Sequence, residues 1–199
     1  MLTNDLANKI CAMHDEAIIV WHAKNNFMQD DLDELFKLIL HNHECNFNLW
    51  YQEDLARRDD RGYQFVYAAK RAIDKYNQMR NNFIEQIDLL LLNSLNISTD
   101  KTCPVHSETP AMIIDKLSIL SLKIYNMRLQ TQRIDVDQQH LTTCNEKLNI
   151  LLAQRQQLSQ CLQIFLTEII DHRRTFKLYH QFKMCNDPTL NPQLYNPND

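Results

Sequence analysis

The sequence of 199 residues contains a single glycine, Gly62. An average chain of this length would have about fourteen, since glycine makes up roughly 7% of residues. Phosphate-binding loops of the G-x-G-x-x-G or Walker type need several glycines, and the tight turns of β-hairpins need residues with positive φ. The shortage of glycine therefore excludes such loops, argues against sheet-rich folds, and favours a few long helices.

Size and charge narrow the class of protein further. The chain is 44% hydrophobic and 23% charged, which is ordinary for a globular protein, and we expect one domain over residues 1–199. Its 21 basic and 25 acidic residues give a net charge of −4, so we expect no nucleic-acid partner. The longest apolar run, residues 87–92, contains Asp88 and is too short for a membrane span.

The six cysteines suggest the compartment. No two of them lie within three positions of each other, so the chain has no C-x-x-C motif of the zinc-binding or redox type. The first residues lack the basic start and apolar core of a signal peptide. We therefore expect reduced, mostly buried cysteines and a cytoplasmic location.

Apolar residues recur at helical spacing in five segments, and the residues at their ends resemble helix caps. The expected helices start at Thr3 or Asn4, at Asp30 or Asp31, at 63, at Pro110 and at 136, and run to about 25, 60, 95, 132 and 173. Thr109 before Pro110 is a strong start signal, because a hydroxyl cap precedes a proline at the first helical position. Gly62 stands where a helix-ending left-handed residue is most often found, which predicts a positive φ.

The expected fold is all-α. It is an antiparallel bundle of four to five long helices with a short C-terminal helix and an irregular Pro-containing tail. We expect a linker over 96–109, a short helix or an extension of the fifth helix to about 184, and an extended tail over 186–199.

Polar side chains form stripes along helices that are otherwise apolar. One stripe on the second helix holds His43, Asn46, Phe47, Trp50, Glu53, Asp54 and Arg57. The third helix has Arg71, Asp74, Gln78, Asn81, Glu85 and Asp88 along one face, flanked by Lys70 and Asn77, and the fourth has Asp115, Ser118 and Lys123. Solvated faces with ion pairs and a buried network that fixes helix register are two alternatives. We favour a polar cleft between the second, third and fourth helices.

Four long blocks resemble the bacterial family known as domain of unknown function 4254: HECNFNLWYQEDLAR from His43, KRAIDKYNQMRNNFIEQID from Lys70, PAMIIDKLSILSLKIYNM from Pro110 and FKLYHQFKMCNDPTLNPQLY from Phe176. Residues 46–57 match its N-x-x-L-W-x-x-E-D-x-A-R core, and residues 114–123 match I-D-[KR]-L-[ST]-I-L-x-L-K. Tyr51 stands where members often have His, so no histidine role carries over to it. The resemblance implies a bacterial, cytoplasmic protein associated with lipopolysaccharide or glycosyl-transfer loci, without an assigned activity.

The residue types in the stripes suit a small polar anion such as a sugar phosphate or a nucleotide sugar, because guanidinium groups bind phosphate and amides bind hydroxyls. His43, Glu53 and Asp54 are the candidate catalytic acids or bases. The candidate ligand-binding residues are Asn46, Trp50, Arg57, Lys70, Arg71, Asp74, Asn77, Gln78, Asn81, Glu85, Asp115 and Lys123.

Other chemistries have less support in the sequence. We expect no metal site and no cofactor, since a di-iron bundle needs paired Glu-x-x-His motifs and only Asp137-x-x-His140 comes near. A magnesium-dependent pyrophosphohydrolase would have to combine Asp31-x-x-Glu34 with Glu85-x-x-Asp88 or Glu168-x-x-Asp171. Cys45 is a weak candidate nucleophile. The rival to ligand binding is a protein-interaction module or homodimer that uses the tail residues Leu190, Leu194 and Tyr195.

Overall fold

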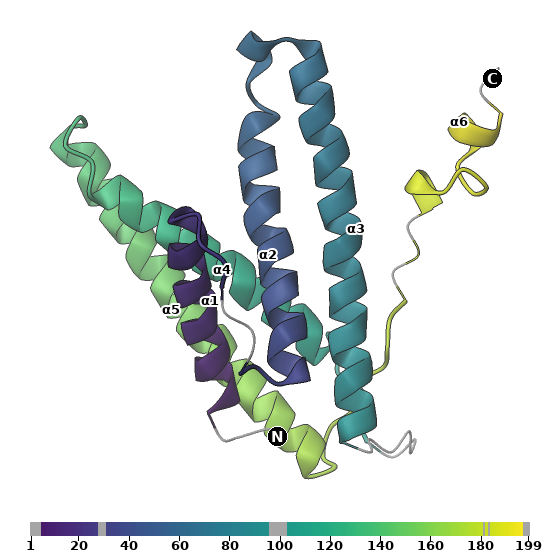
Figure 1. The fold of residues 1–199 in the computed structure, drawn as a ribbon. Helices are drawn as coiled ribbons and strands as arrows, with labels where there is room; N and C mark the ends of the chain where they lie inside the picture. The colour runs from purple at the N-terminus through teal and green to yellow at the C-terminus, as the bar shows by residue number, and fades with distance from the viewer. Residues whose placement is uncertain (1–4, 28–30, 96–102, 181, 183, 197–199) are drawn as a thin grey trace.

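The computed structural model describes residues 5–27, 31–95, 103–180, 182 and 184–196, and its long helices are drawn in Figure 1. They are α1 (Leu6–His22), α2 (Glu34–Leu55), α3 (Tyr63–Ser94), α4 (Pro110–Thr131) and α5 (Gln138–Ile170), with the short pieces η1 (Asp59–Arg61), η2 (Met184–Asn186) and α6 (Pro192–Tyr195). The described residues contain no strand, only an isolated bridge between Val105 and Thr175. The predicted all-α class is confirmed. None of the described helices is long and apolar enough to cross a membrane.

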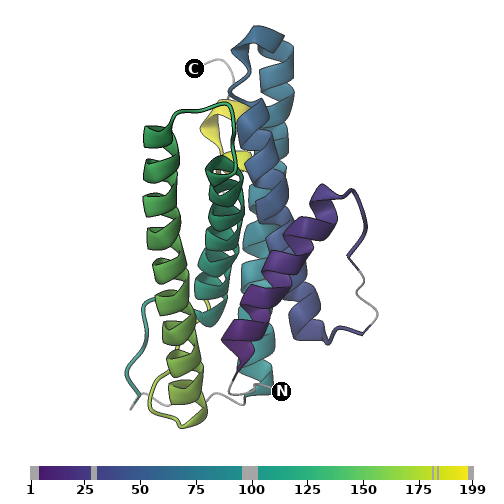
Figure 2. The same cartoon turned by 90° about the vertical axis from the view of Figure 1, so that its left-hand side faces the viewer.

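Two helical hairpins build the bundle. α2 and α3 run antiparallel and side by side, and α4 and α5 do the same. The hairpins meet at one end and diverge toward their turns, so the turns lie apart (Figure 1). α1 packs against α2, α4 and α5, and Figure 2 shows it lying across the face of the bundle.

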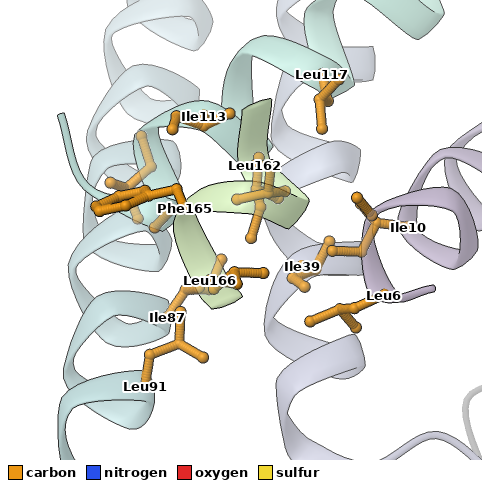
Figure 3. Close-up of a cluster of buried hydrophobic side chains, with 14 of the residues drawn as sticks. Leu6, Ile10, Ile39, Ile87, Leu91, Ile113, Leu117, Leu162, Phe165 and Leu166 are labelled. Carbon is orange, nitrogen blue, oxygen red and sulfur yellow. The ribbon is translucent and has the colours of Figure 1, made fainter. Parts of the chain in front are cut away.

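The hydrophobic core lies at the end where all five long helices meet. Figure 3 shows side chains that converge there from every helix, such as Ile10 of α1, Ile39 of α2, Ile87 of α3, Leu117 of α4 and Leu162 of α5. All five are fully buried. We call this end the closed half. The open half comprises residues 46–73 of the α2–α3 hairpin and 119–152 of the α4–α5 hairpin.

The open half has a much smaller apolar cluster. Its buried members are Leu49, Ala56, Ala69 and Ile73, which all belong to α2, α3 or the turn that joins them. The α4–α5 hairpin contributes no side chain to it.

Helix starts agree with the sequence where the capping signal is strong. The Thr109 hydroxyl accepts a hydrogen bond from the Met112 amide at 3.2 Å, as predicted. α2 begins later than expected, because Asp33 caps it by accepting from the Phe36 amide at 3.0 Å. The proposed cap Asp31 is therefore wrong, and the other proposed cap, Asp30, lies outside the described residues. α2 also ends at Leu55 instead of 60. The proposed caps of the first helix, Thr3 and Asn4, lie outside the described residues.

Gly62 has the predicted positive φ, but a different role. Its φ of 85° and ψ of 164° place it directly before α3, in a region of backbone conformation that is essentially restricted to glycine. The left-handed residues that end helices are Lys24 (φ 58°) after α1 and His172 (φ 55°) after α5. At each, the following amide reaches back to a carbonyl of the last helical turn, at 3.1 and 2.8 Å, as in a Schellman cap.

The chain after α5 differs from the prediction. Residues 171–180 are not helical, and the expected extension to about 184 is wrong. The physical reason is a short strap: the Thr175 backbone bonds Pro104 O at 3.0 Å and His106 N at 2.8 Å, and Phe176 is buried beside Phe165. The tail over 186–199, expected to be extended, contains α6, which begins at Pro192 after an Asn191 cap.

Candidate functional site

A buried carboxylate, Asp115 of α4, lies at the centre of a polar network in the bundle. Its Oδ1 accepts hydrogen bonds from the amide groups of Asn42 at 3.1 Å and Asn46 at 2.9 Å, both on α2, and from Nε of Arg80 on α3 at 2.7 Å. Its Oδ2 pairs with Nη2 of Arg80. The side chain of Asp115 is only 5% exposed, so one carboxylate joins three helices without contact with bulk water.

Ser118 and His43 continue the network toward α1. Nε2 of His43 lies 3.1 Å from the carbonyl oxygen of His14, which can only accept, so Nε2 carries the proton. Burial lowers the pKa of His43 to about 3, so the ring is neutral at pH 7 and its Nδ1 is an acceptor. The Ser118 hydroxyl therefore donates to Nδ1 at 2.6 Å and accepts from the Asn46 amide at 2.9 Å.

The ring of His14 closes this region on the α1 side. It is completely buried with its centroid 4.2 Å from that of His43, and neither of its nitrogens has a hydrogen-bond partner in the described residues. Burial also lowers its pKa well below the ordinary value, so this ring is uncharged. A second link ties α5 to α1, because Nη1 of Arg155 bonds Asp15 at 2.5 Å and Ser121 at 3.2 Å.

The network opens outward into a hollow of about 470 Å³ between α2, α3 and α4, which we call the polar cleft. Its lining residues are Asn46, Leu49, Trp50, Glu53, Asp54, Arg57, Asn77, Arg80, Ile119 and Leu122. The volume lies within the range of about 300–1,000 Å³ that is typical of small-molecule sites. Within the described residues the polar atoms of the Trp50, Asp54 and Asn77 side chains form no hydrogen bonds, so they are available to a ligand.

Arg80 connects the buried network to the cleft, and the sequence analysis missed it. Its side chain is 25% exposed, and Asp115 holds the Nε and Nη2 edge while Nη1 has no partner in the described residues. A signal was present: Ile73, Asn77, Arg80, Ile84 and Ile87 recur at helical spacing, and an arginine inside such an apolar series marks a buried or half-buried charge.

The structure brings together only some of the predicted site residues. Six of them line the polar cleft: Asn46, Trp50, Glu53, Asp54, Arg57 and Asn77. Arg57 is mostly exposed there and pairs with Glu53 at 3.0 Å. Asp115 lies directly behind the cleft and acts on it through Arg80.

The remaining predicted ligand-binding residues lie elsewhere. Arg71 pairs with Asp74 at 2.8 Å on the outside of α3, where Lys70 is also exposed, and Gln78 bonds Asn82 at 2.9 Å. Asn81 is half-buried and does not line the cleft, Glu85 contacts His180 of the tail at 2.6 Å, and Lys123 borders hollows between α4 and α5. The predicted stripe on α3 is thus rotated away from the face that lines the cleft.

His43 does not lie where a catalytic base must be. It is 0% exposed, both of its ring nitrogens are hydrogen-bonded, and its pKa is held low by burial. Among the three candidate catalytic residues, only Glu53 and Asp54 line the cleft.

Three of the carboxylates considered as metal ligands bond to groups of the protein itself. Asp137 caps α5 by accepting from the His140 amide at 2.7 Å, and Asp88 accepts from the Ala111 amide at 2.9 Å at the start of α4. Glu168 pairs with Arg174 at 3.0 Å. Across the described residues no three His, Cys, Asp or Glu side chains are grouped so that they could hold a metal ion.

The cysteines are less buried than expected. All five that the structure describes are free, but only Cys45 and Cys144 are buried, and Cys161 is exposed. Burial raises the pKa of the Cys45 thiol to about 12, which suppresses the thiolate that a nucleophile needs.

Comparison with known families identifies the chain. A family model described as Protein of unknown function (DUF4254) matches residues 36–178. The chain belongs to this family. The matched range contains every residue that lines the polar cleft, whereas α1 precedes it. No match was found among curated proteins or among solved structures.

Proposed function

We propose that the polar cleft binds a small polar molecule with at least one anionic group, such as a sugar phosphate or a nucleotide sugar. The observation that carries this proposal is the orientation of Arg80. Asp115 holds the Nε and Nη2 edge of its guanidinium group by two hydrogen bonds, Nη1 has no partner in the described residues, and Arg80 lines the cleft. A charged donor fixed before the ligand arrives loses little conformational freedom on binding.

Further groups in the cleft suit the same ligand. Arg57 supplies a second guanidinium, which would exchange its exposed pair with Glu53 for a phosphate or carboxylate of the ligand. Asn77 offers an amide for hydroxyl groups, and the indole of Trp50 offers a flat surface for a sugar ring. Glu53 and Asp54 also line the cleft, and in this proposal they are the side chains that would exchange a proton with a bound molecule. The resemblance stated above suggests surface-glycan metabolism as the source of such a ligand.

Calorimetric titration with glucose 1-phosphate tests the proposal. We expect Arg57→Ala to weaken binding by about tenfold or more, because one charge-assisted contact is lost. The matched control is Arg71→Ala. Like Arg57, Arg71 is an exposed arginine that pairs with an acidic residue one helical turn away, but it lies on the outside of α3. We expect it to change affinity by less than twofold. The proposal fails if neither this probe nor a nucleotide binds, or if the two variants behave alike.

A second candidate function is self-association through the tail. Its large apolar side chains remain exposed, with 83% for Phe182, 52% for Leu194 and 59% for Tyr195. If these side chains form one contiguous apolar patch, that patch would be a surface for a partner to cover. Light scattering coupled to gel filtration would compare the full chain with a variant ending at His180. A dimeric mass that falls to the monomer on truncation supports the second function, and a monomer in both cases excludes it.

A further inference from the structure

A second hollow of about 400 Å³ adjoins the polar cleft, between α1, α2 and α4. Aromatic side chains dominate its walls: Trp21 and His22 come from α1, and Phe47, Trp50 and Tyr51 come from α2. We call it the aromatic pocket. Among these rings, the proposed binding of a sugar phosphate uses only that of Trp50.

The walls of the aromatic pocket are held in place by contacts among the rings themselves. The ring centroids of Trp21 and Phe47 lie 5.1 Å apart, and His22 meets Phe47 edge-on at 5.1 Å. On its other side His22 stacks on Tyr125 at 4.6 Å with only 14° between the planes. Burial lowers the pKa of His22, so its ring is neutral at pH 7, and the charged residues of the lining are Lys24 and Asp54. Fixed, uncharged aromatic walls favour a flat ring as the occupant.

The two hollows are neighbours that share part of their lining. Trp50, Asp54 and Leu122 line both of them, so the indole of Trp50 lies at the border between the aromatic pocket and the polar cleft. Asp54 lines both hollows, and its carboxylate has no hydrogen bond or ion pair within the described residues. It can therefore accept a hydrogen bond from an N–H group of a ring next to Trp50.

The chemistry differs across this border. The aromatic pocket offers stacking surfaces, the Asp54 carboxylate and, in its lining, the ammonium group of Lys24. The polar cleft offers the guanidinium groups of Arg57 and Arg80 and the amide of Asn77. A sugar phosphate satisfies only the polar cleft. A molecule that satisfies both must combine a flat ring bearing N–H donors with a phosphate at the other end.

We propose that the ligand is a nucleotide, with its heteroaromatic base in the aromatic pocket and its phosphate beside Arg57 and Arg80 in the polar cleft. This inference rests on the proposed function and narrows its ligand from polar anions in general to nucleotides. The ribose then lies next to Trp50, at the border that the two hollows share.

Tryptophan fluorescence gives a direct measurement of base binding. The sequence has two tryptophans, Trp21 and Trp50, and both line the aromatic pocket. The probes are UDP and ADP, compared with glucose 1-phosphate, which has a phosphate but no base. We expect the nucleotides to quench the fluorescence and to bind at least tenfold tighter, since stacking of a base on aromatic side chains supplies that much.

The decisive variant is Tyr51→Ala. Tyr51 is 58% exposed, so its removal leaves the core intact, and Tyr63→Ala, at a tyrosine that is 81% exposed outside the pocket, is the matched control. We expect Tyr51→Ala to weaken nucleotide binding severalfold and to leave glucose 1-phosphate binding unchanged. Arg57→Ala is expected to weaken both.

The outcomes separate this inference from the proposed function. If glucose 1-phosphate binds in an Arg57-dependent manner while nucleotides bind no tighter, the nucleotide assignment is wrong and the cleft proposal stands. If nucleotides depend on Tyr51 but not on Arg57, the two hollows do not share one ligand, and the inference is again wrong. If no probe binds, both proposals fail.

Discussion

The closed and open halves of the bundle use the same helices in different ways. In the closed half, all five long helices contribute side chains to one apolar core. In the open half, the small apolar cluster belongs to the α2–α3 side alone, and the two hairpins diverge. The polar network around Asp115 lies where the hairpins separate, and both hollows lie beyond it. The comparison teaches that one set of helices can build a shared apolar core at one end and leave two hollows toward the other.

Removal of Asp115 should have the largest effect on stability. We expect Asp115→Ala to lower the free energy of unfolding by about 3–5 kcal/mol, because it leaves Arg80 and two amides without their shared acceptor. Urea denaturation measures the change. Glu53→Ala removes the partner of Arg57 in an exposed ion pair, and it should lower the free energy of unfolding by only about 0–1 kcal/mol. Equal losses would show that the network does not join the hairpins.

A pair of leucines on α5 compares the two halves directly. Leu162 is fully buried in the closed half, and Leu162→Ala should cost about 2–5 kcal/mol through lost apolar contact and the cavity left behind. Leu151 is half-buried beside a hollow in the open half. We expect Leu151→Ala to lower the free energy of unfolding by about 1 kcal/mol or less. Denaturation curves of the two variants decide this, and similar losses would contradict the division into halves.

The pH dependence of stability tests the buried histidine. Burial lowers the pKa of His43 to about 3, so below about 6.5 the unfolded chain binds a proton that the folded chain refuses. Stability from this group is complete above about 6.5 and is lost as the pH falls toward 3. Between pH 7.5 and 4.5 the wild type should lose about 3 kcal/mol more than His43→Gln. Asp88, whose pKa burial raises to about 6, acts in the opposite direction but is present in both proteins. If the stability of the wild type and of His43→Gln fell in parallel with pH, the lowered pKa of His43 would be contradicted.

The smallest expected effect is a gain. Lys24 has a φ of 58° at the end of α1, a conformation that costs a side chain about 1–2 kcal/mol. Lys24→Gly should therefore raise the free energy of unfolding by about 0.5–1 kcal/mol, after the greater freedom of glycine in the unfolded chain is deducted. Lys24→Ala keeps the strain and should give no gain in the same thermal or urea measurement. A gain from alanine would mean that the side chain, and not the backbone, is unfavourable.

Local signals in the sequence predicted much of the fold. Thr109 and Pro110 identified the start of α4, because a hydroxyl cap and a fixed φ act within one turn of the chain. A capping side chain followed by proline also starts α6, at Asn191 and Pro192, so the sequence contained a signal for this helix too. The chain after Ile170 was predicted incorrectly because its conformation depends on pairing with residues 104–106, almost seventy positions away.

The candidate site was predicted only in part, and α3 shows why. The sequence determined that residues 63–94 form a helix with polar residues on more than one face, since periodicity is local. It could not determine which polar face turns inward. That choice depends on how Ile73, Ile84 and Ile87 pack against the other helices, and this packing turns Arg80 toward Asp115 while Asp74 lies outside the cleft. The single glycine and the helix caps set the elements by local sterics, whereas the cleft exists only because two hairpins share one end and diverge at the other.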